Sequence, residues 1–120
     1  MPSLTSLVGA ATAGYGAVLV AAPTVLLRPC GLADTPDTRL LTRSLAVRDV
    51  VLGLALVAAP AGRARRLATA ARVVADAGDA AAFGAGLAGR TARAPLVALA
   101  AAGWGAVTLL ADVLDERAGR

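Results

Sequence analysis

The chain lacks histidine, lysine, asparagine and glutamine, and it contains a single cysteine. Without histidine, a Ser/His/Asp catalytic triad and a His-based metal site are excluded. The single cysteine, Cys30, allows neither an intramolecular disulfide nor a metal site built from several cysteines of one chain. We therefore expect no metal and no cofactor, and we expect Cys30 to be an ordinary loop thiol.

Aromatic and charged residues are also scarce. Aromatic residues make up 2% of the chain and charged residues 17%, against 58% hydrophobic residues. The mean hydropathy is +0.70. A soluble domain of 120 residues would mix apolar and charged residues more evenly. The composition predicts one integral membrane domain, residues 1–120, with the lipid bilayer as its surroundings.

The formal net charge of +4 does not indicate nucleic-acid binding. All twelve basic residues are arginines, they are scattered mainly at the ends of hydrophobic segments, and no aromatic residues alternate with them. Such charges are typical of loops that flank membrane spans. We expect no nucleic-acid partner.

Four hydrophobic segments predict an all-α, up-down bundle of four transmembrane helices with short connections. The expected helices are about residues 4–27, 36–59, 67–89 and 95–111. The first segment has no charged residue, and about 20 apolar residues are enough to cross a hydrocarbon core roughly 30 Å thick. The N-terminal Met1-Pro2-Ser3 lacks the basic region of a secretory signal, so we expect residues 4–27 to remain in the mature protein.

Local signals mark helix ends. Thr35 suits an N-cap, Pro36 suits the first helical position, and Asp37 falls in the first turn, where the helix dipole favours an acid. Pro23 falls near the end of the first segment, where it either kinks the helix or marks its exit into the interface.

The arginines leave the membrane orientation open. An even number of spans places both termini on one side, together with the turn that joins the second and third helices. Five arginines then lie on each side: Arg63, Arg65, Arg66, Arg117 and Arg120 on the side of the termini, and Arg28, Arg39, Arg43, Arg90 and Arg93 on the other. Because orientation follows an excess of arginine and lysine on one side, equal numbers do not decide it.

The third segment carries charges within its predicted span. Arg72, Asp76 and Asp79 fall within about 60° of one another at 100° per residue, so they share one helix face. A central Asp or Arg costs about 2.5–3.5 kcal/mol to insert, whereas a Leu, Val or Phe contributes only about 0.3–0.6 kcal/mol in favour. This helix should be unstable in lipid alone, and its charged face must turn into the bundle.

Polar and aromatic residues of the four segments predict one buried cluster near mid-span. Its members are Tyr15, Arg48, Asp49, Arg72, Asp76, Asp79 and Trp104. We expect Arg48 to pair with Asp76 or Asp79, and we expect partners for the hydroxyl and indole groups. Alternatively, Arg48 snorkels to the interface and lies outside the cluster. The cluster either only holds the helices together or forms a site, because ionisable groups within a membrane are functional candidates.

Small residues predict close helix packing. The segment AGYGAV at residues 13–18 is nearly repeated as AGWGAV at residues 102–107. In both segments one large aromatic residue stands among residues small enough for a neighbouring helix to approach. We expect Gly14 and Gly103 in these segments, and Gly53 one turn after Asp49, to be positions of close packing.

The motif RSLAVRDVVLG at residues 43–53, followed by DAGD at residues 76–79, resembles a family of small four-helix bacterial membrane proteins of unknown function. The similarity covers roughly residues 40–85. The family pattern is an Arg-Asp pair followed by Gly in the second helix and two aspartates in the third, and all are present here. The resemblance implies no established activity, but it implies which positions to test first: Arg48, Asp49, Gly53, Asp76 and Asp79.

Three functions fit a multi-pass protein of the cell membrane with these features. The first is a non-enzymatic assembly or accessory subunit that packs against a second copy or a larger membrane complex. The second is a membrane-embedded enzyme for a lipophilic, isoprenoid- or quinone-like small molecule, with Asp76 or Asp79 as the catalytic proton donor or acceptor. The third is ion or proton translocation, which is the least favoured because four short helices leave little room for alternating access.

Overall fold

The computed structural model describes residues 2–120, which form helices and connecting segments without any strand. The all-α prediction is confirmed, with 81% of the chain helical. Five helices follow one another along the described chain: α1 (Leu4–Ala21), α2 (Thr24–Cys30), α3 (Pro36–Ala58), α4 (Arg63–Gly86) and α5 (Ala94–Arg117).

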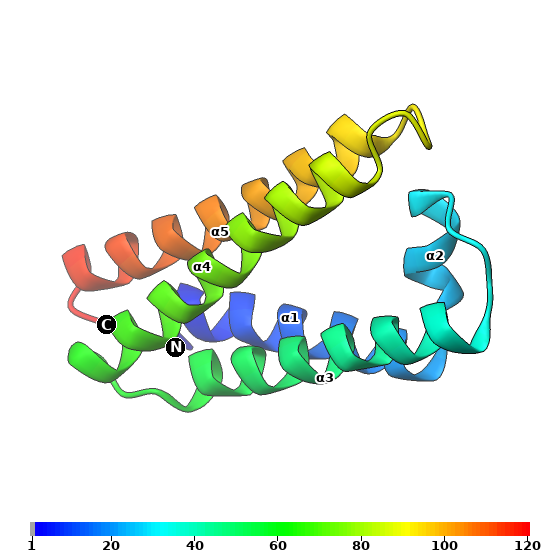
Figure 1. Ribbon diagram of the computed structural model, residues 1–120. Coiled ribbons are helices and arrows are strands. Elements are labelled where there is room, and N and C mark those ends of the chain that lie inside the picture. Colours follow the sequence, from blue (N-terminus) through cyan, green and yellow to red (C-terminus); the bar gives the residue numbers. More distant parts are fainter. Residues whose placement is uncertain (1) are drawn as a thin grey trace.

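The four long helices form two antiparallel pairs, α1 with α3 and α4 with α5 (Figure 1). Both termini lie at one end of the molecule, beside the turn between α3 and α4. The two pairs diverge toward the other end, where the short helix α2 lies across the opening (Figure 1). A cavity lies between the pairs, and five of the charged residues of α3 and α4 line it.

The single helix predicted for residues 4–27 is wrong, because the chain breaks at Ala22 and Pro23. Ala22 has a φ of −136° and a ψ of 77°, outside the helical region. A residue before proline is sterically disfavoured in the helical conformation, and the proline nitrogen has no hydrogen to continue the helical bonds. The chain restarts as α2 in a new direction, so Pro23 ends the first long helix instead of only kinking it.

Cys30 also differs from the expectation of a loop thiol. It is the last residue of α2 and is only 1% exposed. Its side chain belongs to a small hydrophobic cluster with Leu87 and Ala94, which connects α2 to the ends of α4 and α5. Burial raises the pKa of the Cys30 thiol. The cysteine is therefore a packing residue at the wide end of the molecule.

The predicted start of the next helix is confirmed. The Thr35 hydroxyl oxygen accepts a hydrogen bond from the backbone N–H of Thr38, the Thr38 hydroxyl oxygen accepts one from the backbone N–H of Thr35, and Pro36 opens α3. These reciprocal bonds satisfy two N–H groups that would otherwise lack partners at a helix start.

The last two helices begin and end at residues other than those predicted. Helix α4 begins at Arg63 instead of residue 67 and ends at Gly86 instead of residue 89. Gly62 precedes it with a φ of 104°, a conformation that favours glycine. Helix α5 continues to Arg117 instead of ending at residue 111. Charged residues mark the predicted start of α4 and the predicted end of α5, but Arg65, Asp112 and Asp115 are buried with partners and the helices include them.

Gly53 makes the close approach expected of it, whereas Gly14 and Gly103 do not. A Cβ atom at Gly53 would lie 2.5 Å from the backbone nitrogen of Ala13 in α1. At Gly14 and Gly103 an added Cβ would meet no atom of the described residues, 2–120, within 4 Å. The physical reason is helix periodicity: Gly16 in α1 and Gly105 in α5 face the neighbouring helices, and residues two positions earlier point about 200° away.

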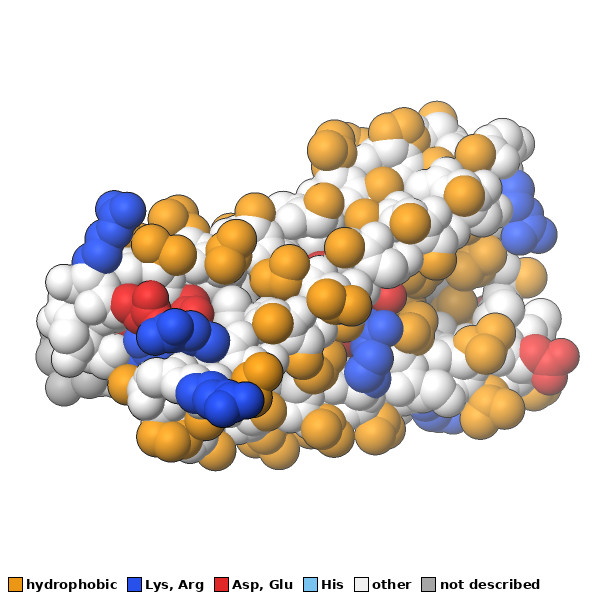
Figure 2. Space-filling view, turned by 60° about the vertical axis from the view of Figure 1, so that its left-hand side comes forward, with side chains coloured by type: hydrophobic (Ala, Val, Ile, Leu, Met, Phe, Trp, Pro, Cys, Tyr) orange, Lys and Arg blue, Asp and Glu red, His pale blue; other side chains and the backbone are white. Residues whose placement is uncertain are grey.

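The molecule has an inverted distribution of polar and apolar side chains. Among the described residues, buried polar and charged side chains outnumber buried hydrophobic ones. Large hydrophobic side chains lie on the outside, with Val74 72% and Leu99 67% exposed. Figure 2 shows hydrophobic side chains over much of one face, with charged groups mainly at its ends and at the hollow between the pairs. Two helices, α1 and α5, are long and apolar enough to cross a membrane.

The contrast between the glycines predicts different effects of the same substitution. Gly53→Ala should lower the free energy of unfolding by about 1–3 kcal/mol, because the new methyl group overlaps the α1 backbone. Gly14→Ala should leave stability unchanged or raise it by up to about 1 kcal/mol through higher helix propensity. Thermal unfolding of the two purified variants in mild detergent, followed by circular dichroism, measures the difference. An equal effect of the two substitutions would contradict the packing of α1 against α3.

Candidate functional site

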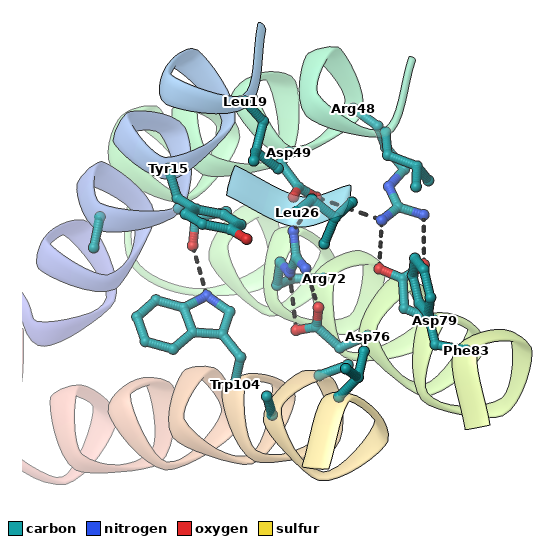
Figure 3. Close-up of a pocket in the computed structure, with 16 residues that line it drawn as sticks. Tyr15, Leu19, Leu26, Arg48, Asp49, Arg72, Asp76, Asp79, Phe83 and Trp104 are labelled. Atoms are coloured by element: carbon teal, nitrogen blue, oxygen red, sulfur yellow. Dashed lines mark hydrogen bonds and ion pairs between the residues drawn. The ribbon is translucent and has the colours of Figure 1, made fainter. Parts of the chain in front are cut away.

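A cavity of about 380 Å³ lies between the two helical pairs (Figure 3). The only tyrosine, phenylalanine and tryptophan of the chain, Tyr15, Phe83 and Trp104, all line it. Most of the remaining lining is Ala, Leu and Val, with Leu26 contributed by α2. The five charged residues in the lining are Arg48, Asp49, Arg72, Asp76 and Asp79. All seven residues of the predicted polar cluster therefore line the same cavity.

Arg72 connects the two helical pairs from α4. Its Nε and Nη2 atoms donate to both carboxylate oxygens of Asp76, one turn further along the same helix. Its Nη1 atom donates to Oδ1 of Asp49 in α3 at 2.7 Å. Arg72 and Asp76 are 4% and 2% exposed. All three nitrogen atoms of the guanidinium group thus donate to carboxylates, which belong to two helices.

Arg48 makes the second bidentate pair. Its Nη1 and Nη2 atoms donate to the two oxygens of Asp79 at 3.1 and 2.6 Å. Nη2 also lies 3.4 Å from Oδ1 of Asp49. Of the two predicted partners, the structure places Asp79 beside Arg48, and the side chain lies in the network instead of at an interface. The Nε atom of Arg48 is buried and has no hydrogen-bond partner among residues 2–120.

Asp49 is the shared member of this network. Its Oδ1 atom accepts the hydrogen bonds from both arginines, whereas its Oδ2 atom has no hydrogen-bond partner in the described chain. Asp49 is 9% exposed and lines the cavity. The ion pairs therefore form one continuous series, in which each residue contacts the next: Asp79, Arg48, Asp49, Arg72 and Asp76 (Figure 3).

The two aromatic members of the cluster differ in their bonding. The indole N–H of Trp104 donates to the hydroxyl oxygen of Thr12 at 2.8 Å, which connects α5 to α1. The expected partner for the Tyr15 hydroxyl is not found among residues 2–120, and Tyr15 is 47% exposed. Its ring forms part of the cavity wall and leaves the hydroxyl group free to bind a ligand.

A second group of buried charges closes the end of the molecule where the termini lie, and our sequence reasoning missed it. Asp115 in α5 accepts hydrogen bonds from the backbone N–H groups of Leu4 and Thr5 and from the Thr5 hydroxyl, at 2.7–2.9 Å. The buried Arg65 donates to Asp112 at 2.7 Å. A signal was present, because Arg65 precedes Arg72 by two helical turns and so shares its face. The predicted helix begins at residue 67, which leaves Arg65 in the preceding turn.

The arrangement limits the chemistry available. Among residues 2–120, no three His, Cys, Asp or Glu side chains are grouped so that they could hold a metal ion. Asp76 and Asp79 each accept two hydrogen bonds from one guanidinium group. The groups still free at the cavity are Asp49 Oδ2, the Tyr15 hydroxyl and the aromatic ring faces. These groups can bind a ligand, and none of them forms a nucleophile paired with a base.

Removal of one member of the network should be costly. Arg72→Leu would leave Asp76 buried without its partner and should lower the free energy of unfolding by about 3–5 kcal/mol. The matched control is Arg39→Leu, because Arg39 pairs with Asp34 at an exposed position, where its hydrogen bond lowers the pKa of Asp34. The control should have little effect, since exposed ion pairs contribute little. Denaturant unfolding in detergent measures the free energy of unfolding of both variants. A loss for Arg72→Leu as small as that for Arg39→Leu would contradict the importance of the Arg72 contacts for stability.

Comparisons with known proteins supply no relative from which a function could be transferred. No protein-family model, no curated protein and no solved structure matches the chain. The resemblance to the small four-helix bacterial membrane proteins therefore remains a hypothesis that rests on the residues of the Arg-Asp and Asp-x-x-Asp motifs. Function has to be inferred from the site itself.

Proposed function

We propose that this chain is an integral membrane protein whose four long helices cross the bilayer, and whose cavity binds a lipophilic small molecule. The observation that carries the proposal is the inverted distribution of side chains, with charged groups inside and large hydrophobic groups outside. In water this distribution would leave apolar surface solvated and charges buried, both at a cost. In lipid the same distribution is favourable.

The charged helices α3 and α4 fit this environment only as parts of the bundle. They contain 23 and 24 residues, so each is about 35 Å long, enough for a hydrocarbon core roughly 30 Å thick. Their central charges all have partners inside the molecule. The insertion cost of about 2.5–3.5 kcal/mol for each charge is thereby offset by ion pairs and hydrogen bonds.

The cavity has the size and lining of a ligand site. Its volume of about 380 Å³ falls in the range of roughly 300–1,000 Å³ typical of small-molecule pockets. Such pockets combine an apolar lining with a few polar groups, and here the polar groups lie together on the Arg/Asp network. A lipophilic molecule could occupy the apolar part while its polar end contacts Asp49 or Tyr15.

The enzymatic alternative, with Asp76 or Asp79 as proton donor or acceptor, is less well supported. Both carboxylates are engaged with guanidinium groups on both oxygens. A guanidinium group bound to both oxygens stabilises the ionised carboxylate, which makes it a weaker proton donor and a weaker base. Binding without catalysis is the function that this geometry supports best.

A second candidate function is assembly with another copy or with a larger membrane complex. Its supporting observation is that four glycines within the helices, Gly14, Gly78, Gly86 and Gly103, have open space beside them. Small residues on exposed faces of membrane helices allow another helix to approach closely. The two candidates are compatible, because these positions differ from the residues that line the cavity.

The membrane arrangement predicts a definite labelling pattern. In a Cys30→Ser background, Ser3→Cys and Arg120→Cys should react with a membrane-impermeant maleimide from the same side of sealed vesicles. Arg90→Cys, in the turn between α4 and α5, should react only from the opposite side. Labelling of all three positions from one side, or extraction of the protein from membranes at alkaline pH, would contradict four crossings.

Assembly predicts a change in apparent mass. In mild detergent the purified protein should form a dimer or larger species in light scattering, and Gly14→Leu combined with Gly103→Leu should shift it toward the monomer. A Cβ at either position meets no atom of residues 2–120 within 4 Å, so there is open space for the larger side chain and the fold should be retained. A strictly monomeric wild-type protein would remove the support for assembly with a second copy.

A further inference from the structure

The cavity contains one more negative than positive charge. Its charged lining comprises three carboxylates, Asp49, Asp76 and Asp79, and two guanidinium groups, Arg48 and Arg72. Asp79 is matched by Arg48 and Asp76 by Arg72, each through two hydrogen bonds. The remaining carboxylate is that of Asp49, which binds Arg48 and Arg72 although each of these arginines already has another carboxylate as its main partner. The formal charge of the lining is therefore −1.

The unmatched charge is presented to the cavity at one atom. Asp49 is 9% exposed, it lines the cavity, and its Oδ2 atom has no hydrogen-bond partner within residues 2–120. This oxygen is accessible, because it is not among the fully buried side-chain atoms that lack a partner. A hydrogen-bond donor or a cation in the cavity can therefore bind it.

Aromatic rings surround the same space. The chain has only three aromatic residues, and Tyr15, Phe83 and Trp104 all line this cavity. Ring faces attract cations through their quadrupole, and this attraction is used in the recognition of quaternary ammonium ligands. If the rings served only to fill apolar space, Leu and Val, which are abundant in this chain, would serve as well. Their concentration beside an unmatched carboxylate indicates a positively charged ligand.

We propose that the cavity binds a lipophilic cation, an amphiphile with an ammonium group, whose charge is matched by Asp49 and the aromatic faces. This inference rests on the proposed binding of a lipophilic molecule and specifies its charge. An anionic ligand fits less well, because both guanidinium groups already hold carboxylates and the lining is negative overall. The apolar lining accommodates the hydrophobic part of the ligand, as it would for a neutral molecule.

Two probes of the same shape, one charged and one neutral, distinguish the effect of the ligand's charge on binding from the effect of its shape. Benzyltrimethylammonium is a cation, and neopentylbenzene is its neutral analogue with carbon in place of nitrogen. Trp104 is the only tryptophan and lines the cavity, so its fluorescence reports binding of either probe. The full chain is reconstituted in phosphatidylcholine vesicles, which carry no net charge to attract the cation, and each probe is titrated.

The wild-type protein should bind the cation at least about 30-fold more tightly than the neutral analogue, as expected for a ligand charge paired with a buried carboxylate. Asp49→Asn should lower the ratio of the cation affinity to the neopentylbenzene affinity by about 30-fold, because only the cation pairs with the carboxylate, and saturable binding of neopentylbenzene to this variant shows that a cavity is still present. Asp34→Asn, the same chemical change at an exposed loop residue, should alter neither affinity.

Each other outcome overturns a defined part of the proposal. Equal or tighter binding of neopentylbenzene to the wild-type protein would overturn the preference for cations but leave a lipophilic cavity in place. An unchanged ratio of the two affinities in Asp49→Asn would overturn the role of Asp49. If neither probe gives a saturable change in Trp104 fluorescence, binding in the cavity fails altogether. The comparison of the two probes on the wild-type protein needs no variant. The proposal can therefore be tested even if Asp49→Asn does not fold.

Discussion

The guanidinium group of Arg72 joins the two helical pairs at the middle of the molecule. It holds Asp76 on its own helix and Asp49 on α3, and Asp49 in turn contacts Arg48, which holds Asp79. Apart from this network, α3 and α4 approach each other little, because each packs mainly against its antiparallel partner. The angle between the pairs, and hence the cavity, depends on these ion pairs together with the contacts between α1 and α5, among them the bond from Trp104 to Thr12.

The small residues and the buried charges have complementary roles. Within each pair, glycines such as Gly53 bring backbones so close that side chains have little space between them. Between the pairs, polar contacts take the place of a hydrophobic core, with Asp115 bound to the start of α1 at one end and the Arg/Asp network at mid-length. In lipid, where apolar side chains gain nothing from leaving the solvent, packing and polar contacts are the forces that remain for helix association.

The sequence was sufficient to predict an all-α protein, the start of α3 and the residues of the cluster around the cavity. The cluster could be predicted because, in helices that cross a membrane as proposed, charges are costly and Arg72, Asp76 and Asp79 must share an interior. The break at Pro23 was left open, since a proline near the end of a span is compatible with a kink or an exit. The roles of Arg65, Asp112 and Asp115 were missed because charges near helix ends were interpreted as solvated.

The closely packed glycines could not all be identified from the sequence, for a different reason. Gly14 and Gly103 stand beside aromatic residues in similar segments, and Gly16 and Gly105 belong to the same two segments. Only the direction in which each helix faces its neighbours decides which of them is packed, and that direction depends on contacts far apart in the chain. The cavity itself was beyond sequence reasoning for the same reason, since it results from the angle between the two pairs.

The position of the network at mid-depth in a bilayer is tested most directly through Trp104, which lines the same cavity as the Arg/Asp network. Its fluorescence can be quenched in vesicles made from phosphatidylcholines brominated at successive positions along the acyl chain. Four crossing helices predict the strongest quenching by bromines near the chain ends, at the centre of the bilayer. Strongest quenching by bromines next to the headgroups would place Trp104 at the interface and contradict a charged network within the membrane.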